Sequence, residues 1–299
     1  MTRRAVRAAG LLAAGMTTVG YASLVERQAY VLRRVTVPCL PTGGEPLRVL
    51  HLSDLHITAG QRRKARWVGA LARLRPDLVV HTGDTLAGAD AVPRALEALR
   101  PLLDFPGAFV LGSNDYYGPT PKNPLRYLRK QHRRVLGTDL PWRSLVAGLT
   151  HAGWADLDNA RVPLHVGDRV LDAAGLDDPH LHRERVDEVL GAPASADASL
   201  RLGVVHSPEP RVLDRLVGDG VALVLAGHTH GGQLRVPGYG AIVTNCGLDR
   251  ARSRGLSTYG AGGRTAWLHV SAGLGTSPYA PYRLACRPEA TLLTLTARR

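Results

Sequence analysis

Short apolar runs alternate with longer amphipathic segments over most of the chain. Three of these runs have the length and composition of buried β-strands, and they cover residues 47–52, 78–81 and 108–111. Between the first two, Trp67, Val68 and Leu71 recur at helical spacing, which predicts a helix over residues 61–74. A second helix is expected over residues 93–102. Strands and helices that alternate every 30 residues or so are typical of βαβ units, so the pattern predicts a layered α/β fold.

The second half of the chain continues this pattern less regularly. We expect a hairpin within residues 164–175 and a helix over residues 183–190. Further strands are expected at residues 200–205, 222–226, 266–270 and 291–295. Residues 231–263 are dense in Gly and Pro, which predicts loops with short strands. No internal repeat and no later break in composition is evident, so residues 46–299 are expected to form one domain.

The first 45 residues do not follow the pattern. Residues 8–25 carry no charge, and their 18 positions just reach the length of a bilayer-spanning helix. Three basic residues precede them, namely Arg3, Arg4 and Arg7. We therefore expect residues 1–25 to be a signal anchor, with membrane association and a catalytic domain outside the cytoplasm. The alternatives are the cleaved signal peptide of a secreted protein and an interfacial helix on a cytoplasmic one. Residues 26–45, which contain Pro38, Pro41, Gly43 and Gly44, predict a linker.

Net charge and cysteine content restrict the function only in part. The formal net charge is +13, which attracts polyanions such as phosphorylated substrates, lipid headgroups or nucleic acid. No nucleic-acid-binding motif is present, so a phosphorylated small molecule or lipid headgroup is the expected partner and nucleic acid is disfavoured. The three cysteines are odd in number and lack Cys-x-x-Cys spacing, so they do not predict a disulfide framework. The sequence does not predict an oligomeric state.

Candidate metal ligands follow five of the predicted strands. They occur in Asp54-Leu55-His56, in Gly83-Asp84, in Gly112-Ser113-Asn114-Asp115, at His206 and in Gly227-His228-Thr229-His230. Active sites of open α/β sheets lie beyond the carboxyl ends of strands, so these residues are expected to meet. Oxygen donors mixed with imidazoles suit divalent Mn, Fe, Co or Zn. Three oxygen donors and four imidazoles are too many for one ion and the right number for two.

The spacing of these residues predicts how two ions would be shared. Asp54 and His56 are two positions apart on an extended segment and can hold one ion together with His230. Asp84 can bridge both ions, and the second would be completed by Asn114, His206 and His228. Two ions roughly 3.5–4 Å apart activate a bridging hydroxide and neutralise a phosphoryl group under in-line attack. The expected activity is therefore hydrolysis of a phosphodiester or pyrophosphate, lipid-linked or free.

In these fragments the chain resembles the calcineurin-like metallophosphoesterases, and the likeness extends over residues 47–295. It looks closest to the membrane-anchored bacterial branch that includes phosphodiesterases and UDP-diacylglucosamine pyrophosphatase-like proteins. The segment Gly273-Leu274-Gly275-Thr276-Ser277 also looks like that branch. The resemblance implies a four-layer α/β/β/α sandwich and a two-metal site on the seven ligands already identified.

One fragment departs from the family pattern. Where the family reads Gly-Asn-His-Asp, this chain reads Gly112-Ser113-Asn114-Asp115. Aligned without a gap, Ser113 replaces the ligand and Asn114 replaces the catalytic His; shifted by one, Asn114 is the ligand and Asp115 takes the His position. We favour Asn114 as ligand, because an amide oxygen is a better donor than a neutral hydroxyl. Asn114 and Asp115 are then the catalytic candidates, and Asp115 would supply the leaving group's proton if its pKa is raised. Without the imidazole we expect a preference for good leaving groups.

Substrate specificity is expected to reside between Asn114 and His206. The candidate side chains are Tyr116, Tyr117, Lys122, Arg126 and Asn159, and His180 could line the same cleft. Two other functions remain open. One is a metal-dependent phosphate-binding protein without catalysis, and the other is a soluble nucleotide phosphoesterase.

Overall fold

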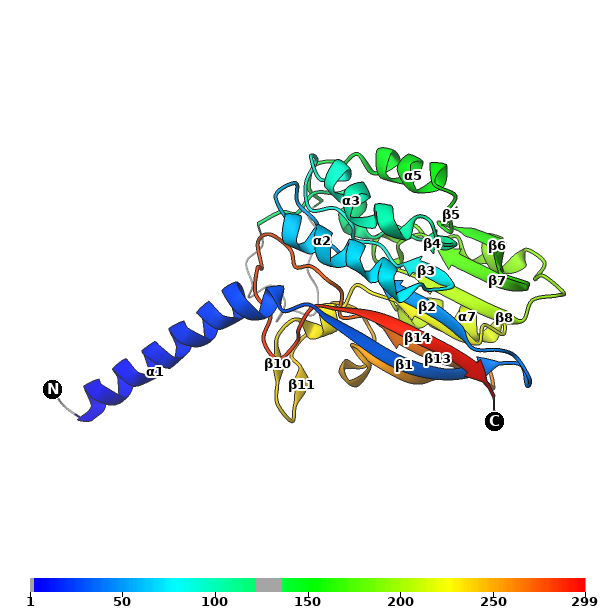
Figure 1. Ribbon diagram of the computed structural model, residues 1–299. Helices are drawn as coiled ribbons and strands as arrows, with labels where there is room; N and C mark the ends of the chain where they lie inside the picture. The colour runs from blue at the N-terminus through cyan, green and yellow to red at the C-terminus, as the bar shows by residue number, and fades with distance from the viewer. Residues whose placement is uncertain (1–2, 122–135, 299) are drawn as a thin grey trace.

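Two β-sheets packed face to face form the centre of the protein, and helices cover their outer faces (Figure 1). The computed structural model describes residues 3–121 and 136–298. The two sheets have six strands each, and a separate two-stranded ribbon projects at one end (Figure 1). This arrangement agrees with the predicted α/β fold, and the sheets are mixed rather than purely parallel.

The first sheet has the strand order β1-β14-β2-β3-β4-β5. Its strands are β1 (Val31–Leu40), β14 (Glu289–Ala297), β2 (Leu47–Leu52), β3 (Leu78–His81), β4 (Gly107–Phe109) and β5 (Ala155–Asp156). Strands β2 to β5 run parallel to one another, whereas β14 is antiparallel to β2 and parallel to β1. The carboxyl ends of β2, β3 and β4 therefore lie side by side at one edge.

The second sheet has the strand order β12-β13-β9-β8-β7-β6. Its strands are β12 (Gly255–Ala261), β13 (Arg264–Val270), β9 (Leu223–Ala226), β8 (Leu200–Val205), β7 (Arg169–Leu176) and β6 (Ala160–Val166). The four central strands β13, β9, β8 and β7 are parallel, and an antiparallel hairpin closes each side. The short ribbon pairs β10 (Arg235–Val236) with β11 (Gly240–Ala241).

Alternation of apolar side chains explains how the sheets form layers. In β2, Leu47 and Val49 pack between the sheets, whereas Leu50 and Leu52 pack against the helices outside. In β9, Leu223 and Leu225 point inward and Val224 points to the other helical layer. Both faces of these strands are buried, which is why the sequence shows continuous apolar runs there rather than alternation with polar residues.

The helices form the two outer layers. On the first sheet lie α2 (Arg62–Ala70), α3 (Val92–Leu99) and α5 (Trp142–His151), whose apolar side chains share one core cluster with the sheet. On the second lie α6 (Val186–Gly191) and α7 (Pro210–Gly218). The order helix, sheet, sheet, helix is the four-layer sandwich that the resemblance implied. The sequence pattern did not predict helices α5 and α7.

The expected linker is wrong for residues 31–40, which form β1. Strand β1 pairs with β14 over its whole length, and Val37 and Leu40 are buried between the sheets. Pro38 is accommodated because β1 is an edge strand, where one side of the backbone needs no hydrogen-bond partner. A run of alternating apolar residues therefore outweighs the turn signals that suggested a linker.

The N-terminal segment is helical and packs on the domain at its base. Helix α1 (Arg3–Gly20) extends away from the sheets and is continued by η1 (Tyr21–Val25) and η2 (Glu26–Gln28) (Figure 1). Glu26 is buried, and its Oε1 accepts a hydrogen bond of 2.6 Å from the backbone N–H of Cys286. Over the described parts of the chain, no helix combines the length and the apolar character required to cross a bilayer. The predicted spanning anchor is thus unsupported.

Candidate metal centre

Seven predicted ligands come from the carboxyl ends of strands in both sheets. Asp54 and His56 follow β2, Asp84 follows β3, and Asn114 lies in the short helix α4 (Ser113–Tyr116) after β4. His206 follows β8 directly, and the pair His228 and His230 follows β9. The structure brings these segments together at one end of the sandwich, as the hydrogen bonds between them show.

Backbone conformation marks five of these residues as unusual. Asp54, His56, Asp84, His228 and His230 all have φ between 39° and 68°. L-residues other than Gly, Asn and Asp rarely adopt this left-handed region, and such residues cost about 1–3 kcal/mol each and cluster at functional sites. Hydrogen bonds to neighbouring strands hold the strained segments, for example from Asp54 N–H to the carbonyl of Gly83 (2.8 Å).

The first group of donors consists of Asp54, His56, Asp84 and His230. One ligand atom from each lies within 4.8 Å of all the others. The Nε2 atoms of His56 and His230 are 3.2 Å apart, and their rings are stacked. His56 Nε2 is 3.3 Å from Asp84 Oδ2, and His230 Nε2 is 3.6 Å from Asp54 Oδ1. Ring nitrogens and carboxylate oxygens that converge in this way suit a divalent cation.

A second group surrounds the same carboxylate of Asp84. Its Oδ1 accepts a hydrogen bond from the backbone N–H of Asn114, and its Oδ2 lies 2.7 Å from the Asn114 side-chain amide. His206 Nε2 is 3.4 Å from Asp84 Oδ2 and 3.3 Å from His228 Nδ1. His206 Nδ1 donates to the carbonyl of Thr82 at 2.6 Å, so Nε2 is the ring nitrogen that faces Asp84. Asn114 and His206 thus both contact Asp84 Oδ2, and His228 contacts His206.

Burial and nearby charges shift the pKa values of Asp54 and Asp84 in opposite directions. Burial raises the pKa of Asp54, although the nearby His206 and His56 oppose the shift. Asp84 is equally buried, but the attraction and hydrogen bonding of His206 and His56 outweigh burial and hold its pKa well below the ordinary value. Burial lowers the pKa of His228 and His230 well below 6.5, so both imidazoles are neutral at pH 7 and able to donate a lone pair.

Residues 112–115, the fragment that differs from the family pattern, place Asn114 against Asp84. Asp115 instead supports the backbone: Oδ1 accepts from the N–H groups of Thr85 (2.7 Å) and Leu86 (3.1 Å), and Oδ2 from that of Gly112 (2.9 Å). Burial and Asp84 raise the pKa of Asp115 to about 6. Its carboxylate can turn toward a leaving group only by breaking these bonds, so its position argues against the proton-donor role that the sequence suggested.

The predicted substrate-binding residues occupy different environments. The Tyr116 hydroxyl donates to Asp177 (2.8 Å), and the guanidinium of Arg183 covers its ring, so the side chain is buried in a polar contact. Asn159 accepts hydrogen bonds from the backbone N–H groups of Asp177 and Arg185, so its side chain holds the backbone of residues 177–185. Tyr117 packs beside Tyr116. Lys122 and Arg126 lie outside the described residues.

Three further residues contact the centre. His180, in the short helix η6 (Pro179–Leu181), places its ring 4.5 Å from that of His228. Arg283 is fully buried beneath His230, where its Nη2 lies 3.3 Å from Nδ1 of that ring and donates to the carbonyls of the segment 272–275. Lys64 is also buried and donates to the carbonyl of Leu55 (2.6 Å). Of these, only His180 had a sequence signal, in the turn that begins at Asp177.

Comparison with known proteins agrees with this arrangement. Residues 47–232 match the sequence model of the calcineurin-like phosphoesterases, which covers more than half of the chain. The chain is 28% identical over 300 residues to the Bacillus subtilis (strain 168) protein YpbG, with 97% of each chain covered. It is 26% identical to the metallophosphoesterase YkuE of the same organism, covering 96% of this chain and 94% of the relative. It is also 26% identical to the phosphodiesterase YaeI of Escherichia coli (strain K12), covering 98% of both.

A four-layer sandwich with acidic and imidazole donors at its strand ends defines a metal-dependent phosphoesterase. The chain belongs to the calcineurin-like phosphoesterase family, so the predicted class of enzyme is confirmed. This family uses divalent metals, and the cluster formed by Asp54, His56, Asp84 and His230 fits such an ion.

Proposed function

We propose that the protein hydrolyses phosphodiesters or pyrophosphates with two divalent ions. Asp54, His56 and His230 would hold the first ion, and Asn114, His206 and His228 the second. The observation that carries the proposal is the position of Asp84, because its Oδ2 lies 3.3 Å from His56 in the first group and 3.4 Å from His206 in the second. One carboxylate between two donor sets is what a bridging ligand requires.

The protein's own contribution is the placement of these donors. When bound, two ions lower the pKa of water and neutralise charge on a phosphoryl group. Asn114 adds a neutral donor, so the second group carries less negative charge than an all-carboxylate set. Gly112 and Gly227 leave room for the two carboxylates. A Cβ on Gly112 would lie 2.4 Å from Asp84 Oδ1, and one on Gly227 would lie 2.6 Å from Asp54 Oδ2.

The fragment 112–115 further supports a preference for good leaving groups. It contains no imidazole, and Asp115 is engaged with three backbone N–H groups. General acid catalysis typically contributes about 10²–10⁴-fold, and its loss matters most when the leaving group is basic. We therefore infer that pyrophosphates and aryl phosphodiesters react faster than simple alkyl phosphates. Rates on a series of aryl phosphodiesters should fall steeply as the leaving group's pKa rises, and a flat series would contradict the inference.

Metal reconstitution tests the activity itself. Metal-free protein would be titrated with Mn, Fe, Co or Zn, with bound metal counted by elemental analysis and turnover followed on a nitrophenyl phosphodiester. We expect activity to appear as about two ions bind per chain, and Asp84→Asn to reduce both affinity and rate. A preparation that binds two ions of each metal without turnover would refute the proposed activity.

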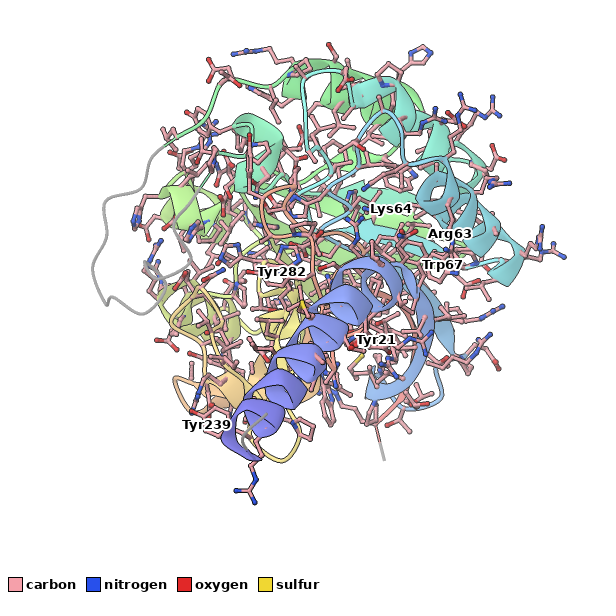
Figure 2. All side chains as sticks on the ribbon, turned by 90° about the vertical axis from the view of Figure 1, so that its left-hand side faces the viewer. Tyr21, Arg63, Lys64, Trp67, Tyr239 and Tyr282 are labelled. Carbon is pink, nitrogen blue, oxygen red and sulfur yellow. The ribbon has the colours of Figure 1, made fainter. Side chains whose placement is uncertain are left out.

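We further propose that the protein works at an anionic membrane surface. Leu12, Met16 and Val19 share one face of α1 and are 63–70% exposed, which is unusual for large apolar side chains. At the base of α1 a shallow cavity of about 540 Å³ is lined by residues that include Arg63, Arg66 and Arg287. Figure 2, viewed from the α1 side, shows Arg63 and Trp67 beside the base of this helix. Among the described residues, none of the ion pairs involves these three arginines.

Vesicle flotation tests this location. The full chain should bind vesicles that contain phosphatidylglycerol more strongly than neutral ones, and removal of residues 1–20 should weaken binding to both. Arg63→Gln with Arg66→Gln should remove the preference for anionic lipid, whereas Arg100→Gln, an exposed arginine on another helix, should not. Equal binding by all variants would rule out this surface.

A further inference from the structure

A chain of buried polar side chains leads from the second sheet to Asp54. It starts at His269 in β13, whose Nδ1 is 2.8 Å from Nδ1 of His51 in β2. His51 Nε2 is 3.0 Å from Thr82 Oγ1, and Thr82 Oγ1 is 2.7 Å from Ser53 Oγ. The last contact joins Ser53 Oγ to Asp54 Oδ2 at 2.5 Å. Four consecutive hydrogen bonds thus cross the interface between the sheets and end on a predicted ligand.

The direction of each hydrogen bond follows from the next bond toward Asp54. A metal-ligating carboxylate only accepts, so Ser53 donates its single proton to Asp54. Ser53 Oγ then accepts from Thr82, which has a weaker alternative in the carbonyl of Leu52 at 3.4 Å. Thr82 Oγ1 in turn accepts from Nε2–H of His51. A neutral imidazole has one N–H, so Nδ1 of His51 accepts and Nδ1–H of His269 donates.

The chain is sealed from water along its length. Ser53, Asp54, Thr82 and His51 are 0% exposed and His269 is 1% exposed. Gly227 closes the end near the ligand, since a Cβ there would lie 1.9 Å from Ser53 Oγ. Burial lowers the pKa of His51 well below 6.5 and that of His269 to about 4, which agrees with two neutral rings. Without water nearby, the loss of one of these hydrogen bonds would leave a buried polar group unpaired at a high cost in free energy. All four hydrogen bonds are therefore strongly favoured.

We infer that this relay from His269 to Ser53 fixes which oxygen of Asp54 faces the first metal ion. Oδ2 is held by Ser53, and the backbone N–H of His228 contacts both oxygens at 3.1–3.2 Å. Oδ1 is the atom directed at His230 Nε2. His51, Thr82 and His269 are therefore positioning residues that act through Asp54. The inference rests on the proposed role of Asp54 as a ligand, but it does not depend on the substrate.

The neighbouring pair His81 and Thr85 supplies a matched control. His81 Nε2 is 2.8 Å from Thr85 Oγ1, and His81 Nδ1 is 3.3 Å from the carbonyl of Leu52, so this pair has the same chemistry. Both residues are 1% exposed. Within the described part of the chain, the hydrogen bonds of these two side chains lead to no metal ligand, in contrast to those of Thr82.

Nuclear magnetic resonance of the metal-free and metal-loaded protein tests the bond directions. Nitrogen chemical shifts distinguish protonated from bare ring nitrogens, and each ring can be assigned from its His→Gln variant. We expect His51 to carry its proton on Nε2 and His269 on Nδ1. A proton on Nδ1 of His51 would overturn the inference, whether or not the protein proves to be a phosphoesterase.

Metal affinity tests the consequence. Thr82→Val should weaken binding of the first ion by about 10–100-fold, the usual effect of losing a partner behind a ligand, while Thr82→Ser should keep most of the affinity. Thr85→Val should change affinity less than threefold. Comparable losses in Thr82→Val and Thr85→Val, or no rescue by Thr82→Ser, would assign the threonine a purely structural role and refute the relay. If Thr82→Val does not fold, the metal affinity of Thr82→Ser and the resonance measurements still test the inference.

Discussion

Gly112→Ala is the substitution whose effect on the metal centre can be worked out most directly. Gly112 precedes Asn114 and has extended backbone angles that alanine also adopts, so the change introduces no backbone strain. A Cβ there would lie 2.4 Å from Asp84 Oδ1, 2.7 Å from Cε1 of His206 and 2.8 Å from the backbone N of Asp84. The effect is therefore steric and falls on the carboxylate assigned to both ions.

The size of the effect follows from the shift that is needed. Real Cβ contacts are rarely closer than 3.0 Å, so Asp84 Oδ1 must move by at least 0.6 Å, and by 1.0 Å to reach ordinary contact at 3.4 Å. A misplacement of about 1 Å can cost 10²-fold in rate, which corresponds to about 2.7 kcal/mol of transition-state stabilisation. We expect kcat/KM on a nitrophenyl phosphodiester to fall about 100-fold at saturating metal, with weaker metal binding by calorimetry.

Gly60→Ala is the matched control for this experiment. Gly60 also lies in a loop, four residues after His56 in the sequence, but a Cβ there would meet no atom within 4 Å. The control should keep wild-type kcat/KM within about twofold, since nothing must move. If Gly112→Ala behaved like Gly60→Ala in both rate and metal affinity, the tight placement of Asp84 would not matter and the reasoning would be refuted.

Three further predictions concern the buried groups around the centre. Burial, then Arg283 and Arg27, lower the pKa of Lys64 from 10.5 to about 7. Between these pH values the unfolded state binds more protons than the folded state, so the stability of the wild type should rise with pH. Urea unfolding should show this rise relative to Lys64→Met, by roughly a few kcal/mol from pH 7 to pH 10. A constant difference in the free energy of unfolding between the two proteins would contradict this. Arg283→Met should lower Tm and weaken metal binding, because it removes the hydrogen bonds that hold residues 272–275, whose backbone contacts Asp54, whereas the exposed Arg100→Met should do neither. Removal of residues 1–20 should leave Tm unchanged, but removal of residues 1–28 should lower it by about 4–8 °C, since two hydrogen bonds onto residues 283–286 are lost; equal Tm values would show that this contact adds nothing.

Much of the fold could be predicted because its strands are buried on both faces. The runs that end at Leu52, His81, Val205 and Ala226 were predicted with the correct carboxyl ends. Those ends also place the candidate ligands, so the positions of these residues follow from the same pattern as the strands. Its class followed from the residue types, which is why the enzyme prediction was confirmed by comparison.

The remainder depended on contacts that sequence spacing does not encode. His51 and His269 meet across the two sheets although 218 positions separate them, and each alone resembles an ordinary core histidine. Arg283 lies in a loop without periodicity, and its burial follows only from the folding of that loop over His230. Strand β1 was assigned to a linker because its turn residues are local signals, whereas its partner β14 lies at the other end of the chain.

The position of β14 has a consequence for how the protein is made. The last strand lies between β1 and β2, the first two strands, and pairs with both. During synthesis β1 therefore has no partner in its sheet until residues 289–297 have left the ribosome. The segment just before β14 also completes the metal centre, since the backbone N–H of Gly275 donates to the carbonyl of Asp54. Contacts this distant slow folding, so β1 and the metal centre can assemble only after residues 275–297 have been synthesised.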